Sequence, residues 1–307
     1  MVYLDGVAAP NIVEKMEKQL KKIDIDAVLD TNYIAELIRG NPLSPFKTTG
    51  TTERPDVAAA KILEGRVVLM VDGSPVALTA PFLFLEYFQT NEDYYSWFYF
   101  GTIGRLLRFL GFLITTCLPG IYLALVTYHQ ELLPTRFLLN LSSARSGLPF
   151  PTLFEMILLI LAFELIREGG TRIPSGFGQT LSIVGGLVLG QASVEAQLVS
   201  IPVVIIIAFT GITGLIVPAL KGPVILIRII WLILSAIFGI FGCFIGIITL
   251  LIHLASLDSF GIPYTSTLSR GFAQKSQDTL IRSPWTRMIF RPEQIAPKNR
   301  RRQRRPK

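Results

Sequence analysis

Charged residues are scarce in this chain. Asp, Glu, Lys and Arg make up only 17% of its 307 residues, against about 25% in a typical soluble domain. The deficit lies in residues 103–255, where long apolar runs follow one another, whereas residues 1–75 have an ordinary soluble composition. The composition therefore predicts an integral membrane protein with a soluble head.

Cysteine and histidine are almost missing as well. The two cysteines, Cys117 and Cys243, both lie in apolar runs, which excludes a disulfide framework or a CxxC metal site. His129 and His253 have no second ligand at i+3 or i+4. With no nucleophile–base pair and no phosphate loop, the sequence predicts neither an enzyme nor a cofactor or metal. The first residues also lack the pattern of a signal peptide.

The formal net charge of +7 comes mainly from the end of the chain. Seven of the last ten residues are Lys or Arg. In a membrane protein such a cluster marks the cytoplasmic side and contacts anionic lipid. We therefore predict contact with membrane lipid and no binding of nucleic acid.

The head, residues 1–80, is predicted to be a partial soluble α/β subdomain. Apolar residues recur at helical spacing from Ile12 to Ile23, and further helices are expected at Tyr33–Arg39 and Val57–Leu63. Two apolar runs, 66–71 and 76–79, flank an Asp-Gly-Ser-Pro turn and predict a β-hairpin. Residues 81–102 are predicted to be a connector at the membrane surface.

Residues 103–256 are predicted to form an α-helical membrane bundle of four to five helices, followed by a basic cytosolic tail, 257–307. Arg105 and Arg108 should lie on the same side as the tail, which requires an even number of crossings. We expect four crossings, with the shortest apolar segment re-entrant or in the interface. The apolar segments are Phe109–Thr127, Leu153–Ile166, Leu181–Val199, Ile201–Leu220 and Val224–Ala255.

The segment Leu181–Val199 has two different faces on a helical wheel. Small residues on one face, with a weaker pair further along the chain, predict close helix packing: Ser182, Gly186, Gly190, Gly242 and Gly246. The opposite face carries the candidates for lining a pore: Val184, Val188, Gln191 and Glu195. An ionisable residue facing lipid is costly. Glu195 therefore either faces an aqueous path or pairs with a buried arginine, and the sequence leaves both open.

A second group of charges surrounds Gly169-Gly170. Two interpretations remain: a solvated salt-bridge cluster, or a charged gate at a channel mouth. The candidate gate residues are Glu164, Arg167, Glu168 and Arg172.

Several stretches together resemble the GerA family of spore germination proteins, specifically the A subunit of germinant receptors. The resemblance covers essentially the whole chain. The stretches are KIDID at 22–26, NPLSPF at 41–46, TERPD at 52–56, NEDYY at 91–95, PFPTLFE at 149–155, FELIREGGTRIP at 163–174, GQASVEA at 190–196, HLASLDSFGIPY at 253–264 and DTLIRSPW at 278–285.

The resemblance implies a multi-pass protein of the spore inner membrane with both termini in the cytosol. It implies a homo-oligomer, a pentamer, that forms a nutrient-gated cation channel and assembles with a transporter-like B subunit and a lipoprotein C subunit. Family members carry a further soluble subdomain upstream, so the chain is expected to be N-terminally truncated relative to them.

A second function of a different class is compatible with the same motifs. A close relative in the sporulation operon that handles dipicolinic acid would share them, and would act as an accessory or scaffold membrane protein. Neighbouring genes would separate the two hypotheses.

Overall fold

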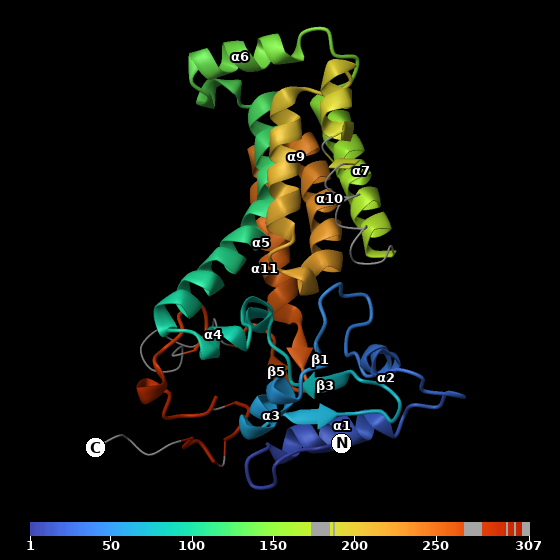
Figure 1. The fold of residues 1–307 in the computed structure, drawn as a ribbon, viewed down its shortest axis with the longest axis vertical. Helices are drawn as coiled ribbons and strands as arrows, with labels where there is room; N and C mark the ends of the chain where they lie inside the picture. The colour runs from blue at the N-terminus through green and yellow to red at the C-terminus, as the bar shows by residue number, and fades with distance from the viewer. Residues whose placement is uncertain (173–184, 187, 267–277, 293, 298, 303–307) are drawn as a thin grey trace. The chain divides into compact units, whose positions relative to one another are not determined.

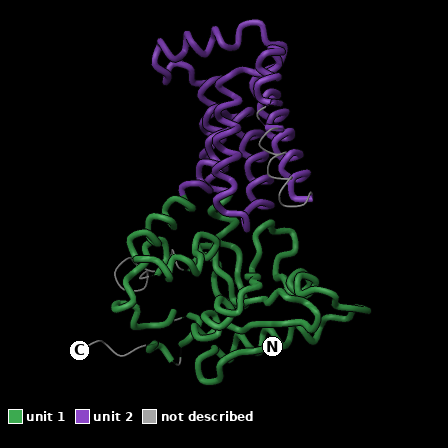
Figure 2. The backbone as a smooth tube through the Cα atoms, in the orientation of Figure 1, with its two compact units in different colours: residues 1–109, 250–307 green, residues 110–249 purple. Residues whose placement is uncertain are grey.

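The computed structural model of the chain describes residues 1–172, 185–186, 188–266, 278–292, 294–297 and 299–302 (Figure 1). The chain divides into two compact units (Figure 2). Unit 1 contains Met1–Phe109 and Leu250–Lys307, and unit 2 contains Leu110–Thr249. The first and last segments of the chain therefore belong to one unit. The division into head, connector, bundle and tail stays a prediction.

Unit 1 contains an antiparallel three-stranded sheet in the order β1-β3-β2. The strands are β1 (Gly50–Thr52), β2 (Val67–Leu69) and β3 (Ala77–Ala80). Every residue of β2 and β3 is buried. Val67 pairs with Ala80 across these two strands, which confirms the predicted hairpin.

Three helices pack around this sheet: α1 (Pro10–Leu20), α2 (Thr31–Leu37) and α3 (Pro55–Leu63). Ile12 and Met16 lie one turn apart on α1 and are completely buried, as expected for the apolar face of a helix. At the start of α2 the carboxylate of Asp30 accepts the backbone N–H of Asn32 at 2.7 Å, a standard N-cap.

The core of unit 1 also contains residues from the last part of the chain. Ile262 and Ile295 belong to the same buried cluster as Ile12 and Leu78. The hydroxyl of Ser259 donates to the carbonyl of Thr48 at 2.7 Å. The described part of the C-terminal segment therefore completes the hydrophobic core of the head.

The remaining short elements of unit 1 frame this core. They are η1 (Phe84–Phe88), α4 (Glu92–Tyr95), β4 (Asp258–Ser259), β5 (Ile262–Pro263) and η4 (Trp285–Arg287). All five residues of η1 are buried within the unit. A position of residues 81–102 at the membrane surface stays a prediction.

Unit 2 is a helical bundle. In Figure 1, α7, α9 and α10 run side by side and α6 lies across one end of the bundle. The helices, two of which continue into unit 1, are α5 (Phe98–Thr127), α6 (Thr135–Arg145), α7 (Thr152–Arg172), α9 (Ile201–Gly214), α10 (Lys221–Phe238) and α11 (Ile240–Ser256), with the short turns η2 (Gln130–Leu132) and η3 (Pro218–Leu220).

Among the described residues, two helical segments are long and apolar enough to cross a membrane, Phe98–Thr127 and Pro218–Phe238. Two further apolar helices, α9 and α11, are shorter. Helix α7 has 21 residues but carries five charged side chains. The fold is thus mostly helical with a small N-terminal sheet, and the described residues contain fewer such long apolar helices than the four to five expected.

Two predicted segments end differently in the structure. The apolar run Val224–Ala255 is not one helix, because Gly239 adopts a φ of 60° and separates α10 from α11. The predicted helix Leu181–Val199 has helical residues at 185–186 and 188–195 but turns at 196–199. Its residues 181–184 and 187 lie outside the described part of the chain.

The two helices separated by Gly239 pack closely against each other. A Cβ atom added at Gly242 would overlap the carbonyl of Leu234, and one at Gly246 would overlap the indole of Trp231. These two glycines therefore serve contacts within the chain, since only glycine permits such close approach of α11 to α10.

Candidate functional site

A group of charged side chains, here called the bundle cluster, lies between α7 and α10. It consists of Glu164, Arg167 and Arg228. The guanidinium of Arg228 donates to Oε1 of Glu164 at 2.6 Å, and Arg167 forms an ion pair with Oε2 of the same carboxylate. Arg228 is only 2% exposed. One carboxylate therefore serves two arginines in an apolar bundle, where an unpaired charge would be costly.

The other two gate candidates lie outside this cluster. Glu168 is exposed and accepts from Arg172 and from Lys221, each at 3.1 Å. The structure therefore brings together Glu164 and Arg167 in a half-buried pair, and Glu168 and Arg172 in a solvated one. Whether any of the four forms a gate stays a prediction.

Arg228 was not predicted as a site residue, although the sequence contains a signal for it. It is the one charged residue in the apolar run from Val224 to Phe238, and a lone charge in such a run needs a partner. Glu155 is a similar case on α7. It is completely buried and accepts the backbone N–H of Ser200 at 2.8 Å and the hydroxyl of Ser200 at 2.9 Å. This carboxylate therefore fixes the turn before α9.

The described pore-lining candidates lie on the outside of unit 2. Val188, Gln191 and Glu195 are all exposed, and Val188 is 56% exposed. The side-chain amide of Gln191 donates to Oε1 of Glu195 at 3.0 Å. The hydrogen-bond partner of Glu195 in the structure is thus the side-chain amide of Gln191, one helical turn away. Val184 lies outside the described residues.

Gly190, one of the small residues of the same segment, lies next to α9. A Cβ added at Gly190 would be 3.7 Å from Cγ1 of Val204 on α9. At Gly186 it would meet no atom within 4 Å. Ser182 lies outside the described residues. The small face therefore contacts the chain's own bundle at Gly190, and a role in assembly stays a prediction.

A second charged group, here called the junction cluster, connects α5 to the C-terminal segment within unit 1. It consists of Asp93, Arg105, Arg108 and Asp278. Arg105 is completely buried and donates to Asp93 at 3.1 Å and to Asp278 at 2.7 Å. Its guanidinium also lies 5.2 Å from the ring centre of Tyr94. Arg105 and Arg108, expected only as anchors at the membrane, thus have defined carboxylate partners.

Asp93 is held in its charged form. Burial alone would raise the pKa of its carboxyl, but hydrogen bonds from Arg108, the backbone N–H of Thr90 and Arg105 outweigh burial and hold this pKa below its ordinary value. Arg108 contributes two of these bonds, at 2.5 and 2.6 Å. The ion pairs of Asp93 with Arg105 and Arg108 therefore persist at neutral pH.

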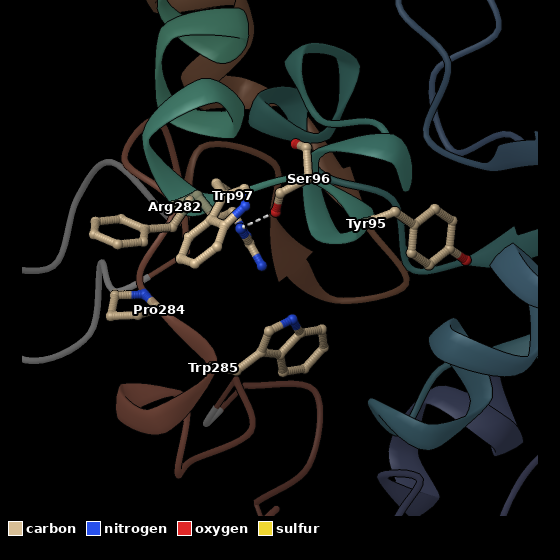
Figure 3. A pocket seen from close by; sticks show the side chains of 7 residues that line it. Tyr95, Ser96, Trp97, Arg282, Pro284 and Trp285 are labelled. Carbon is tan, nitrogen blue, oxygen red and sulfur yellow. Dashed lines mark hydrogen bonds between the residues drawn. The ribbon is translucent and has the colours of Figure 1, made fainter.

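A cleft of about 320 Å³ opens beside the junction cluster in unit 1 (Figure 3). Aromatic side chains from the start of α5 and from η4 line it together with Arg282. Across the described residues, no group of three or more His, Cys, Asp or Glu side chains is arranged to hold a metal ion. The chemical features of the described sites are therefore ion pairs and aromatic surfaces.

This chain is similar in sequence to several known proteins. The uncharacterized membrane protein YfkQ of Bacillus subtilis (strain 168) is 43% identical over 294 residues, which are 95% of this chain and 57% of YfkQ. Spore germination protein KA of the same strain is 42% identical over 305 residues, 99% of this chain and 56% of the relative. Spore germination protein GerLA of Bacillus cereus is 39% identical over 301 residues, 97% of this chain and 61% of the relative.

The chain spans about three-fifths of the length of these curated relatives. No solved structure matches it. A family model described as the Bacillus/Clostridium GerA spore germination protein matches residues 1–294. This match covers nearly the whole chain and agrees with the relatives, so the chain belongs to the GerA family of spore germination proteins.

Proposed function

We propose that this chain acts in spore germination as the A subunit of a germinant receptor in the spore inner membrane. The observation that carries the proposal is the family match over residues 1–294, together with relatives that are named spore germination proteins. Its partners in this proposal are further copies of itself, five in the complete assembly, and the B- and C-type receptor subunits.

The packing of unit 1 supports an even number of membrane crossings. Residues before α5 and residues after α11 share one hydrophobic core and are joined by the Arg105–Asp278 ion pair. Two segments that pack in one unit lie on the same side of a membrane. We propose four crossings, with α7 re-entrant or in the interface and both termini in the cytosol.

The exposed polar face of unit 2 supports a path for ions. Lipid offers no hydrogen-bond partner to Gln191 or Glu195, so these side chains meet water or another copy of the chain. In a symmetric oligomer, one carboxylate from each copy would form a ring that favours cations. We therefore propose that Val184, Val188, Gln191 and Glu195 line a cation channel between copies.

The germination proposal is tested by deleting the gene for this chain. Spores without it should lose germination with the nutrient that the receptor recognises, measured as loss of optical density, and the parental gene should restore the response. Unchanged germination with every nutrient tested would contradict the proposal. Spores that germinate normally but contain less dipicolinic acid would instead favour the accessory function in sporulation.

A further inference from the structure

The cleft in unit 1 combines an aromatic lining with a buried cation. Its walls include Tyr95, Trp97, Phe98 and Trp285, and the guanidinium of Arg282 lies among them (Figure 3). Such a surface suits a ligand that has both an apolar part and an anionic part. None of the candidate channel residues belongs to it.

Arg282 has unused hydrogen-bonding capacity. The residue is only 3% exposed. Its Nη1 donates to the carbonyl of Ser96 at 2.9 Å, and its Nη2 to the carbonyl of Tyr94 at 3.4 Å. Its Nε is buried without a hydrogen-bond partner among the described residues. A buried charged donor without an acceptor is unfavourable, so an anionic oxygen in the cleft would complete this site.

The position of the cleft along the chain indicates which kind of molecule would supply this anionic oxygen. Phe98, one of its walls, is the first residue of α5, which is long and apolar enough to cross a membrane. The neighbouring aromatic residues are also exposed: Trp97 is 75% exposed, and Tyr99 and Phe100 are similar. Exposed Trp and Tyr at the end of a membrane helix lie at the level of the lipid headgroups.

Two arginines besides Arg282 lie near the cleft. The guanidinium of Arg302 lies 5.2 Å from the ring centre of Trp285, and Arg287 is in η4 beside it. The carboxylates around the cleft already have partners: Asp56 accepts from the hydroxyl of Tyr95 at 2.6 Å and is paired with Arg54 at 2.8 Å, and Asp93 and Asp278 are both paired with Arg105. Arginine is suited to phosphate, because its planar fork donates two parallel hydrogen bonds.

We propose that this cleft binds the phosphate headgroup of an anionic phospholipid, with the phosphate at Arg282 and the glycerol backbone against the indoles of Trp97 and Trp285. The lipid would hold unit 1 at the membrane surface where α5 begins. This site is independent of the proposed channel, because it uses other residues and another unit.

The test measures quenching of tryptophan fluorescence by brominated lipid. The purified full chain is placed in phosphatidylcholine vesicles that contain increasing amounts of brominated phosphatidylglycerol or brominated phosphatidylcholine. We expect phosphatidylglycerol to quench at a lower mole fraction than phosphatidylcholine. Arg282→Lys keeps the charge but loses the fork, and should raise the half-quenching mole fraction about tenfold, which corresponds to about 1.4 kcal/mol.

Two further variants make the result decisive. Tyr95→Ala removes an exposed aromatic wall of the cleft and leaves every tryptophan in place. It should keep the fold intact while weakening phosphatidylglycerol binding, so it decides the case if Arg282→Lys does not fold. Arg136→Lys makes the same exchange at an exposed position of α6 and should behave like the parent. Equal quenching by the two lipids, or parental quenching in Tyr95→Ala, would overturn the proposal. Displacement of the brominated lipid by millimolar inorganic phosphate would overturn the assignment to a lipid.

Discussion

Replacing Arg105 by alanine is expected to destabilise unit 1 by about 3–5 kcal/mol, the usual effect of removing one partner from a buried ion pair. The guanidinium is completely buried and neutralises Asp93 and Asp278 together. Its loss leaves Asp278 without its charge partner at the junction of α5 and the C-terminal segment. We expect a much lower melting temperature of the purified protein in detergent, and little folded protein in the membrane.

The matched control for Arg105→Ala is Arg54→Ala. Arg54 also pairs with two carboxylates, Asp56 and Glu92, but this group is solvent-exposed and should change the melting temperature little. Asp278→Asn should have an intermediate effect, because Arg105 keeps its bond to Asp93. Equal melting temperatures for Arg105→Ala and Arg54→Ala would show that the junction cluster does not stabilise unit 1.

Replacing Glu164 by alanine is expected to destabilise the helical bundle by about 2.5–3.5 kcal/mol, the cost of an unpaired charge in a membrane helix. The change removes the carboxylate that serves Arg228 at 2.6 Å and Arg167. Arg228 cannot reach water easily, since it is buried on α10. The yield of monodisperse protein and its melting temperature in detergent measure the effect.

A second change should reverse much of this loss. Arg228→Met replaces the buried cation by an apolar side chain of similar length, so Glu164→Ala with Arg228→Met should be more stable than Glu164→Ala alone. Glu168→Ala is the matched control on the same helix, because its ion pairs are exposed. If the double variant were no more stable than Glu164→Ala, the bundle cluster would not explain the effect.

The sequence predicted those elements whose signals are local. The β2–β3 hairpin was predictable because two short apolar runs flank a turn that contains Gly73, at a φ of 81°. The break between α10 and α11 was not predictable from hydropathy. Gly239 lies between apolar residues on both sides, and a glycine in such a run can serve either a turn or close helix packing.

In the candidate sites, too, only contacts between residues close in sequence could be predicted. Glu164 and Arg167 are three residues apart on a helix, so their pairing could be expected from spacing. Their joint partner Arg228 comes from another helix, and Asp278 is 173 positions from Arg105. Contacts over such separations depend on the packing of whole helices, which a single sequence does not reveal. The role of the C-terminal segment in the core of unit 1 was missed for this reason.

The measurement that tests the proposed function most directly is cation flux through vesicles that contain the purified full protein. The parent should conduct cations, and Glu195→Gln should reduce this flux severalfold with the same amount of folded protein, because it removes the charge from the exposed polar face and keeps its shape. Glu131→Gln makes the same change at another exposed position of unit 2 and should conduct like the parent. Equal flux through the parent, Glu195→Gln and Glu131→Gln would contradict the proposed path.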